Sequence, residues 1–303
     1  MPGPIRHLRM MGVISALLVS SVSLAGCGSY KKASADYRYG LHGAPTPAQQ
    51  AAALHATRAY RSLVVQASQR FATAAGKLRD AAERGNLTEA RLQWAIAQAS
   101  YDTFRGEIMA NSNTELSIAG RLQDQPFFIG RTGLHALEQD LFTADHSRLV
   151  ADATSLAGKG MLVQIGLMRT IRTPERIMNT AAQSISWAIN QTLAHSQEPY
   201  AQRDLLDVVA VVASVAVMVD AVSGLGEIVA PHDLSILRQR LTVIESLLQK
   251  ISKGVSNGVD ITLNAEIPAA SWRLLSVQMT ALVGPLTTLG GDMDGFGSGR
   301  TYA

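Results

Sequence analysis

Apolar residues along most of this chain recur every three or four positions, and polar residues fill the opposite helical face. Stretches that alternate apolar and polar residues between turn signals are nearly absent. The pattern predicts helices over residues 47–84, 86–110, 130–142, 147–171, 174–194, 203–222, 232–251 and 266–289. We therefore expect an all-α fold, with long antiparallel helices in one or two up-and-down four-helix bundles.

Local signals mark several of the expected helix starts and ends. A threonine followed by a proline stands at residues 46–47 and 173–174, which is typical of a hydroxyl N-cap with proline in the first turn. Asn86, with Glu89 three residues later, resembles a capping box. The glycines within residues 224–226 are expected to form a turn after the helix that contains residues 203–222.

The most apolar segment after the N-terminal region spans residues 205–219. It contains Asp207 and is followed by Asp220, and it falls short of the roughly 20 residues that cross a bilayer. We interpret it as the central helix of a bundle.

The first 28 residues have the layout of a bacterial lipoprotein signal. Arg6 and Arg9 precede an apolar stretch over residues 10–22, and small residues lead to Cys27, the only cysteine in the chain. The alternative is an uncleaved transmembrane anchor, for which this stretch is short. We therefore predict an exported protein that is lipid-anchored to the cell membrane, on its extracytoplasmic face, through Cys27.

This interpretation divides the chain into four parts. They are a signal peptide (1–26), a lipidated cysteine with a polar tether (27–45), a helical domain (46–289) and a glycine-rich flexible tail (290–303).

Composition limits the stabilising forces and the partners. If Cys27 carries lipid, no disulfide can form, and stability must come from a core drawn from a chain that is 47% hydrophobic. Loss of Arg6 and Arg9 with the signal lowers the formal charge from +3 to +1, and basic and acidic residues alternate along the chain. Nothing indicates nucleic-acid binding, which usually requires a basic face.

The candidate chemistry lies in residues 133–138. His135 and Glu138 are three residues apart on an expected helix, so their side chains share a face and can reach one metal ion. The alternative is a simple hydrogen bond between the two side chains. Zinc-protease motifs with two histidines, a serine nucleophile elbow and a phosphate-binding loop are all missing from the sequence.

Residues 133–142 (GLHALEQDLF) resemble the Gly-x-His-x-x-Glu segment of the imelysin-like proteins, closest to the EfeO/EfeM type of iron-uptake lipoproteins. Residues 100–108 are similar to the family's Tyr-x-x-Ile-Glu helix, and residues 117–121 fall where an Ile-Asp-x-Arg segment is usual. Residues 198–207 look like its Glu-x-Tyr-Ser-x-x-Asp-Leu-x-Asp segment. The resemblance covers about residues 50–289. The additional cupredoxin-like domain of many EfeO proteins is expected to be missing, because only residues 28–45 separate Cys27 from the first helix.

The resemblance implies a two-bundle fold in which His135, Glu138 and Glu107 form a metal site in a cleft between bundles. Weaker candidate ligands are Glu115 and Asp204, and the possible cleft residues are Arg105, Arg121 and Tyr200. Structural alternatives are a solvated carboxylate for Glu107, exposed salt bridges for the arginines and a helix cap for Asp204.

The resemblance also implies iron uptake alongside a membrane permease and a haem peroxidase, with zinc or copper as other ions that the ligands suit. Ala119 stands where the family places an acid, and residues 205–219 are apolar where it has a Glu-Ala-Asn run, so two potential ligands are missing. The alternatives are a metallopeptidase of the imelysin type and a helical scaffold lipoprotein without metal binding.

Overall fold

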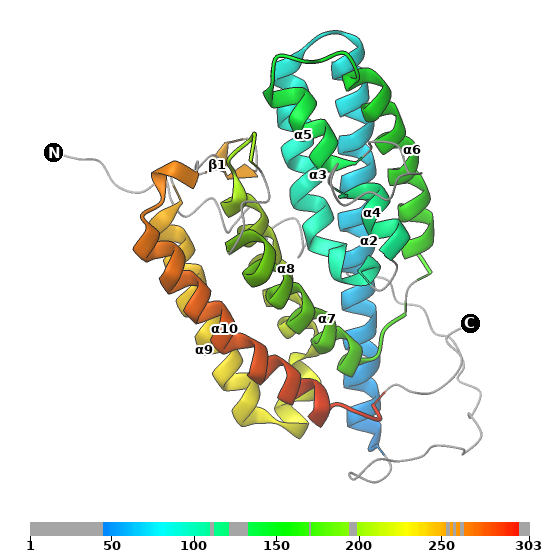
Figure 1. The fold of residues 1–303 in the computed structure, drawn as a ribbon. Helices are drawn as coiled ribbons and strands as arrows, with labels where there is room; N and C mark the ends of the chain where they lie inside the picture. The colour runs from blue at the N-terminus through cyan, green and yellow to red at the C-terminus, as the bar shows by residue number, and fades with distance from the viewer. Residues whose placement is uncertain are drawn as a thin grey trace, which may run out of the picture.

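The computed structural model describes residues 45–109, 112–120, 133–169, 171–193, 199–252, 255–256, 259–260 and 264–296. These residues form two groups of long helices that pack side by side (Figure 1). The predicted signal peptide, Cys27, most of the tether, Arg121 and residues 297–303 lie outside the described residues.

The first group holds the N-terminal half of the helical domain, coloured blue to green in Figure 1. Its helices are α2 (Pro47–Glu83), α3 (Leu87–Ile108), α4 (Ser112–Ile118), α5 (Leu134–Phe142) and α6 (Leu149–Leu167). Helix α2 packs against both α3 and α6, while the short α5 covers α3 and α6.

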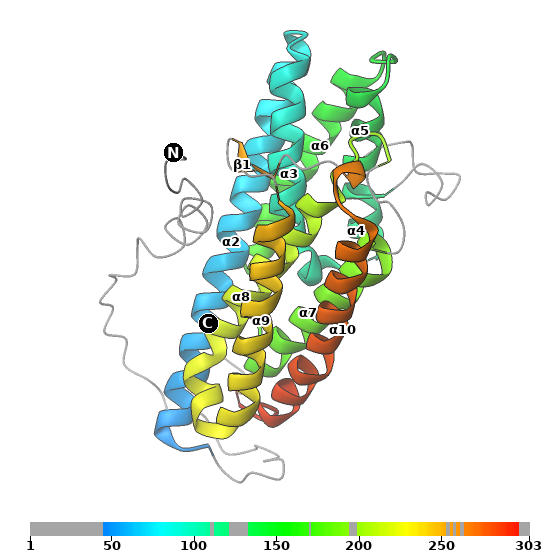
Figure 2. The ribbon, with the colours of Figure 1, turned by 90° about the vertical axis from the view of Figure 1, so that its left-hand side faces the viewer.

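The second group contains α7 (Pro174–Trp187), continued by a π-helical segment η2 (Ala188–Leu193), then α8 (Asp204–Val229), α9 (Pro231–Ile251) and α10 (Ala269–Asp292). Before α10 come a two-residue antiparallel pair, β1 (Val255–Ser256) with β2 (Val259–Asp260), and a 3₁₀ turn, η3 (Asn264–Glu266). Helices α9 and α10 form the outer layer of this group, in front of α8 in Figure 2. The predicted all-α bundle fold is confirmed.

The predicted helix caps are present. Thr46 and Gln49 form a reciprocal capping box at the start of α2, and the Thr173 side chain accepts a hydrogen bond from Arg176 N at the start of α7. The Asn86 side chain accepts from Glu89 N at the start of α3, whereas the Glu89 side chain accepts from Gln93, so only the Asn86 half of the expected capping box is seen. Each cap satisfies an amide that has no partner within its helix.

Two expected boundaries were wrong. Helix α8 continues through Gly224 and Gly226 to Val229 and does not turn at the glycines. A glycine costs a helix only about 1 kcal/mol, and burial of neighbours such as Leu225 outweighs that cost. At the C-terminal end, Gly290 belongs to α10, and Met293 and Phe296 are buried, so this part of the predicted flexible tail packs on the fold.

Helix α8 joins the two groups, because it packs against α2 and α3 on one side and against α7 and α9 on the other. Within the described residues, α8 and α10 are long and apolar enough to span a membrane by length and composition alone. Two thirds of the apolar window of α8 is buried inside the fold. This burial agrees with the prediction that residues 205–219 belong to a central bundle helix.

Helix α3 approaches α7 closely at Gly106. A Cβ at this position would lie 2.5 Å from Thr180 Cγ2 and 2.7 Å from the Ser184 hydroxyl, both on α7. Nearby, the Ser214 hydroxyl of α8 donates to the Thr103 carbonyl of α3 at 2.8 Å. The two groups of helices are therefore in tight contact at the C-terminal end of α3.

We expect Gly106→Ala to lower the free energy of unfolding by about 1–3 kcal/mol, because the added methyl group overpacks the contact between α3 and α7. Gly76→Ala is the matched control, since Gly76 lies within α2 with open space around it. That control should raise the free energy of unfolding by about 0.5–1 kcal/mol through backbone entropy. Urea denaturation measures both values, and equal effects of the two substitutions would contradict the close approach.

Candidate functional site

Helix α5 carries His135 and Glu138 and is fixed at both ends by α3. The Trp94 indole donates to the Leu134 carbonyl at 2.9 Å, and the Arg91 guanidinium donates to the Leu141 carbonyl at 2.9 Å. Gly133 precedes the helix with φ of 112°, and a Cβ there would lie 2.7 Å from the Ile118 carbonyl oxygen. Glycine is therefore required at the first position of the Gly-x-His-x-x-Glu segment.

The His135 and Glu138 side chains lie together in the interior. Their exposed fractions are 8% and 1%, and His135 Nδ1 is 3.6 Å from Glu138 Oε2, which is too long for a hydrogen bond. The other carboxylate oxygen, Oε1, accepts from the backbone amides of Tyr200 at 2.9 Å and Ala201 at 2.8 Å. One oxygen of Glu138 thus holds the turn before α8, and the other faces the imidazole.

The two facing atoms are both buried and have no hydrogen-bond partner within the described part of the protein. A buried carboxylate oxygen without a partner is energetically costly. Its ordinary remedies are a proton, a cation or an ordered water. Over the described ranges, no group of three or more His, Cys, Asp or Glu side chains is arranged to hold a metal ion.

Glu107 is placed in a different part of the structure from His135 and Glu138. Its Oε1 accepts from the Tyr60 hydroxyl at 2.6 Å, and its Oε2 pairs with Arg172 Nη2 at 2.7 Å. Burial and the Glu107 charge raise the pKa of Tyr60, so the phenol stays protonated and donates. Trp94, which contacts the start of α5, precedes Glu107 by about 20 Å along α3, so Glu107 does not join the pair.

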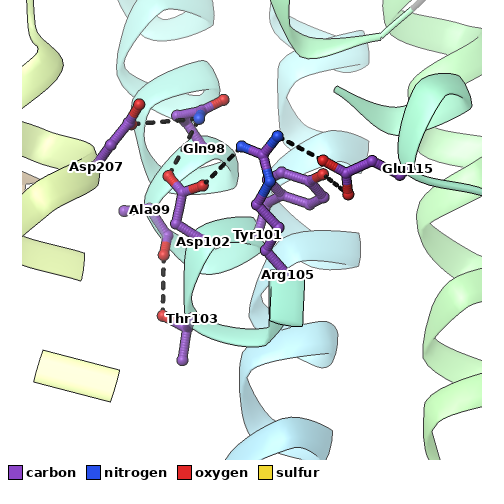
Figure 3. A network of polar contacts seen from close by, with 8 residues as sticks. All are labelled: Gln98, Ala99, Tyr101, Asp102, Thr103, Arg105, Glu115 and Asp207. Carbon is purple, nitrogen blue, oxygen red and sulfur yellow. Dashed lines mark hydrogen bonds and ion pairs between the residues drawn. The ribbon is translucent and has the colours of Figure 1, made fainter. Parts of the chain in front are cut away.

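Glu115 is likewise engaged elsewhere, with an arginine (Figure 3). Its Oε1 pairs with Arg105 Nη2 at 2.5 Å, and its Oε2 accepts a hydrogen bond from the Tyr101 hydroxyl at 2.5 Å. The Arg105 guanidinium also stacks on the Trp187 ring of α7, with its central carbon 3.6 Å from the ring centroid. Arg105 therefore links α3, α4 and α7 and neutralises a partly buried acid.

A second set of buried polar groups lies between α3 and α8. The Gln98 amide nitrogen donates to Asp102 Oδ2 at 3.1 Å and to Asp207 Oδ1 at 3.2 Å, which joins the two groups of helices (Figure 3). Burial raises the pKa of Asp102 to about 6, although Arg105, Asp207 and Gln98 each act to lower it. Gln98 follows Trp94 by about 6 Å along α3, so this network begins near the start of α5.

The remaining predicted residues are spread around this region. Asp204 is buried at the first turn of α8, where its Oδ2 accepts from the Asn264 amide at 2.9 Å. Tyr200 is 44% exposed, and its backbone amide is one of the two that bind Glu138. The structure thus brings His135 together with Glu138, and Arg105 together with Glu115.

Sequence reasoning missed the network of Gln98, Asp102 and Asp207 and the pairing of Glu107 with Arg172. Gln98 and Asp102 are four residues apart on α3, so their side chains share a helical face, and that spacing was a usable signal. The pairing of residues separated by more than sixty positions has no local signature.

No protein-family model matches this chain, and no curated protein sequence matches it. The resemblance to the imelysin-like family, drawn from the order of the motifs, stays a prediction.

The raised pKa of Asp102 predicts a pH-dependent stability. The folded protein holds the Asp102 proton up to about pH 6, whereas the unfolded chain releases it near pH 4. The stability that the Asp102 proton contributes is therefore fully present below about pH 4. As pH rises from about 4 to about 6, the free energy of unfolding falls by up to about 3 kcal/mol.

Asp102→Asn should remove this part of the pH dependence, because the amide cannot ionise. Urea unfolding at a series of pH values measures the free energy of unfolding and its pH dependence. Asp294→Asn, at an exposed aspartate, is the control and should leave the pH profile unchanged. An unaltered profile in Asp102→Asn would show that Asp102 titrates normally in the fold.

Proposed function

We propose that this protein is a membrane-anchored, extracytoplasmic metal-binding lipoprotein of an iron-uptake system, and that His135 and Glu138 hold the ion. The observation that carries the proposal is the pair of buried facing atoms, His135 Nδ1 and Glu138 Oε2, each without a hydrogen-bond partner in the described structure.

The geometry around Glu138 supports ion binding. Two backbone amides fix Oε1, so the orientation of Oε2 toward the imidazole is set before any ion arrives. Preorganised ligands of this kind lose little conformational freedom on binding. In addition, no arginine or lysine pairs with Glu138 among the described residues, so no basic side chain competes with a cation for this carboxyl group.

The donor set indicates the class of ion. One imidazole nitrogen and one carboxylate oxygen suit iron, and also zinc or copper, whereas calcium and magnesium prefer oxygen ligands alone. The imelysin-like resemblance favours iron among these. In this proposal the ion is cargo, to be passed to a membrane permease that works with a haem peroxidase, and lipid on Cys27 keeps the protein at the membrane.

A helical scaffold lipoprotein without metal binding is the second candidate. Glu107 is occupied by Arg172 and Tyr60, and Glu115 by Arg105 and Tyr101, so these acids serve as structural ion pairs. In that case Glu138 would serve only to hold the backbone turn that precedes α8.

Isothermal titration of the purified protein with ferrous, ferric, zinc and copper ions distinguishes the two. We expect saturable binding, weakened at least about tenfold by His135→Ala and by Glu138→Gln, since loss of even an outer partner of a ligand costs about this much. His232→Ala is the matched control, because His232 is exposed at the start of α9.

The Glu107→Gln variant adds a second comparison. We expect it to bind the ion like the parent chain while unfolding more easily, because Arg172 loses its charged partner. Absence of binding by the parent chain, or equal binding by His135→Ala, would leave the scaffold as the surviving function.

A further inference from the structure

Helix α6 exposes a row of large apolar side chains. Met161, Leu162, Ile165 and Met168 are 58%, 69%, 52% and 42% exposed, and their spacing places them on one helical face. The opposite face of α6 packs on α2, with Leu156, Gly160 and Leu167 buried. The other exposed large apolar residues of the described structure are Val150 at the start of α6, Ile171 and Tyr200 outside the helices, Ile228 on α8, Val243 on α9, and Leu274 and Val277 on α10. A contiguous apolar surface of this kind usually marks an interaction site.

The surroundings of this row are basic. The Arg61 guanidinium of α2 donates to the Met168 carbonyl at 2.7 Å, which places Arg61 beside the row, and Arg58 lies one turn earlier on α2. Both arginines and Arg169 are exposed. The sequence contains no Asp or Glu over residues 45–79 or over residues 153–174. We call Met161, Leu162, Ile165 and Met168, with Arg58 and Arg61, the α6 face.

The α6 face lies near the end of α2 from which the N-terminal segment leaves. Helices α2 and α6 are antiparallel, since Arg61 contacts Met168 while Ala72 and Phe71 lie against Gly160. The start of α2 at Pro47 is therefore about 20 Å along the helix from Arg61. The predicted tether from Cys27 to Pro45 spans up to about 60 Å when extended, so a lipid on Cys27 leaves the α6 face free to reach the same membrane.

We infer that the α6 face docks on the surface of a membrane that contains anionic phospholipids. Apolar side chains enter the boundary between headgroups and acyl chains, and arginines beside them pair with lipid phosphates. A lipid on Cys27 would hold the domain near the membrane without fixing its orientation, and a second, protein-borne contact would fix that orientation.

Charge argues against a second copy of this chain as the occupant. In a symmetric dimer built on the α6 face, each copy would present the same surface, so the arginines of one copy would face a surface that carries the same arginines. No acidic residue in the two segments that form this surface is available to neutralise them. An anionic lipid surface satisfies both the apolar row and the cations.

A fluorescent label reports the docking directly. The lipidated protein with Ile165→Cys carries one reactive thiol, because Cys27 is predicted to be consumed by lipid, and it is labelled with an environment-sensitive nitrobenzoxadiazole. Val277→Cys is the matched control, at a 62% exposed apolar residue on α10, in the other group of helices (Figure 1). Both are anchored in phosphatidylcholine vesicles with and without phosphatidylglycerol, and circular dichroism checks the helix content.

We expect the emission of the label at residue 165 to shift to the blue in phosphatidylglycerol vesicles, with no shift at residue 277. Arg58→Gln and Arg61→Gln should each reduce the ratio of docked to undocked protein roughly fivefold, and added salt should have the same direction of effect. An unshifted label at residue 165, or an equal shift in phosphatidylcholine alone, would overturn the inference. A shift that depends on the density of protein on the vesicle would also overturn it, because it would indicate that a second copy covers the α6 face.

Discussion

The cost of burying charge governs the polar interior of this protein. A carboxylate removed from water must meet a cation, accept several hydrogen bonds or keep its proton. Glu107 and Glu115 meet arginines, and Asp102 has a raised pKa. Glu138 is treated differently, because two backbone amides bind one of its oxygens while the other faces an imidazole at 3.6 Å. One oxygen of Glu138 is thus bound, and the other has no hydrogen-bond partner among the described residues. This unpartnered oxygen makes the site on α5 a candidate for binding an ion.

The same charges also hold the two groups of helices together. Arg105 leaves α3 to bind Glu115 and to stack on Trp187, and Gln98 bridges Asp102 to Asp207 on α8. Gly106 lets α3 and α7 approach closely enough for these contacts. The Glu138 carboxylate adds a further connection, since the amides that it binds belong to the turn before α8. The proposed ion site and the junction between the groups are therefore parts of one interior.

Local features of the fold could be predicted from the sequence, whereas long-range pairings could not. A threonine cap or an amphipathic repeat acts within a few residues, so its signature is written in one segment. The end of α8 was predicted too early. The helix-breaking tendency of Gly224 and Gly226 can be read from the local sequence, whereas the burial of α8 against other helices, which outweighs it, cannot. His135 and Glu138 were expected to face each other because they are three residues apart. The partner of Glu107 is Arg172, sixty-five positions later, and no periodicity indicates such a contact.

The metal content of the protein purified from the cells that produce it is the decisive measurement. Elemental analysis of the parent chain beside Glu138→Gln reads out whether the α5 pair holds an ion where the protein works. We expect a stoichiometric transition metal in the parent chain, with iron first among the expected ions, and its loss from the variant. A parent chain free of metal, or a variant that retains it in full, would show that the pair holds no ion and would leave a helical scaffold.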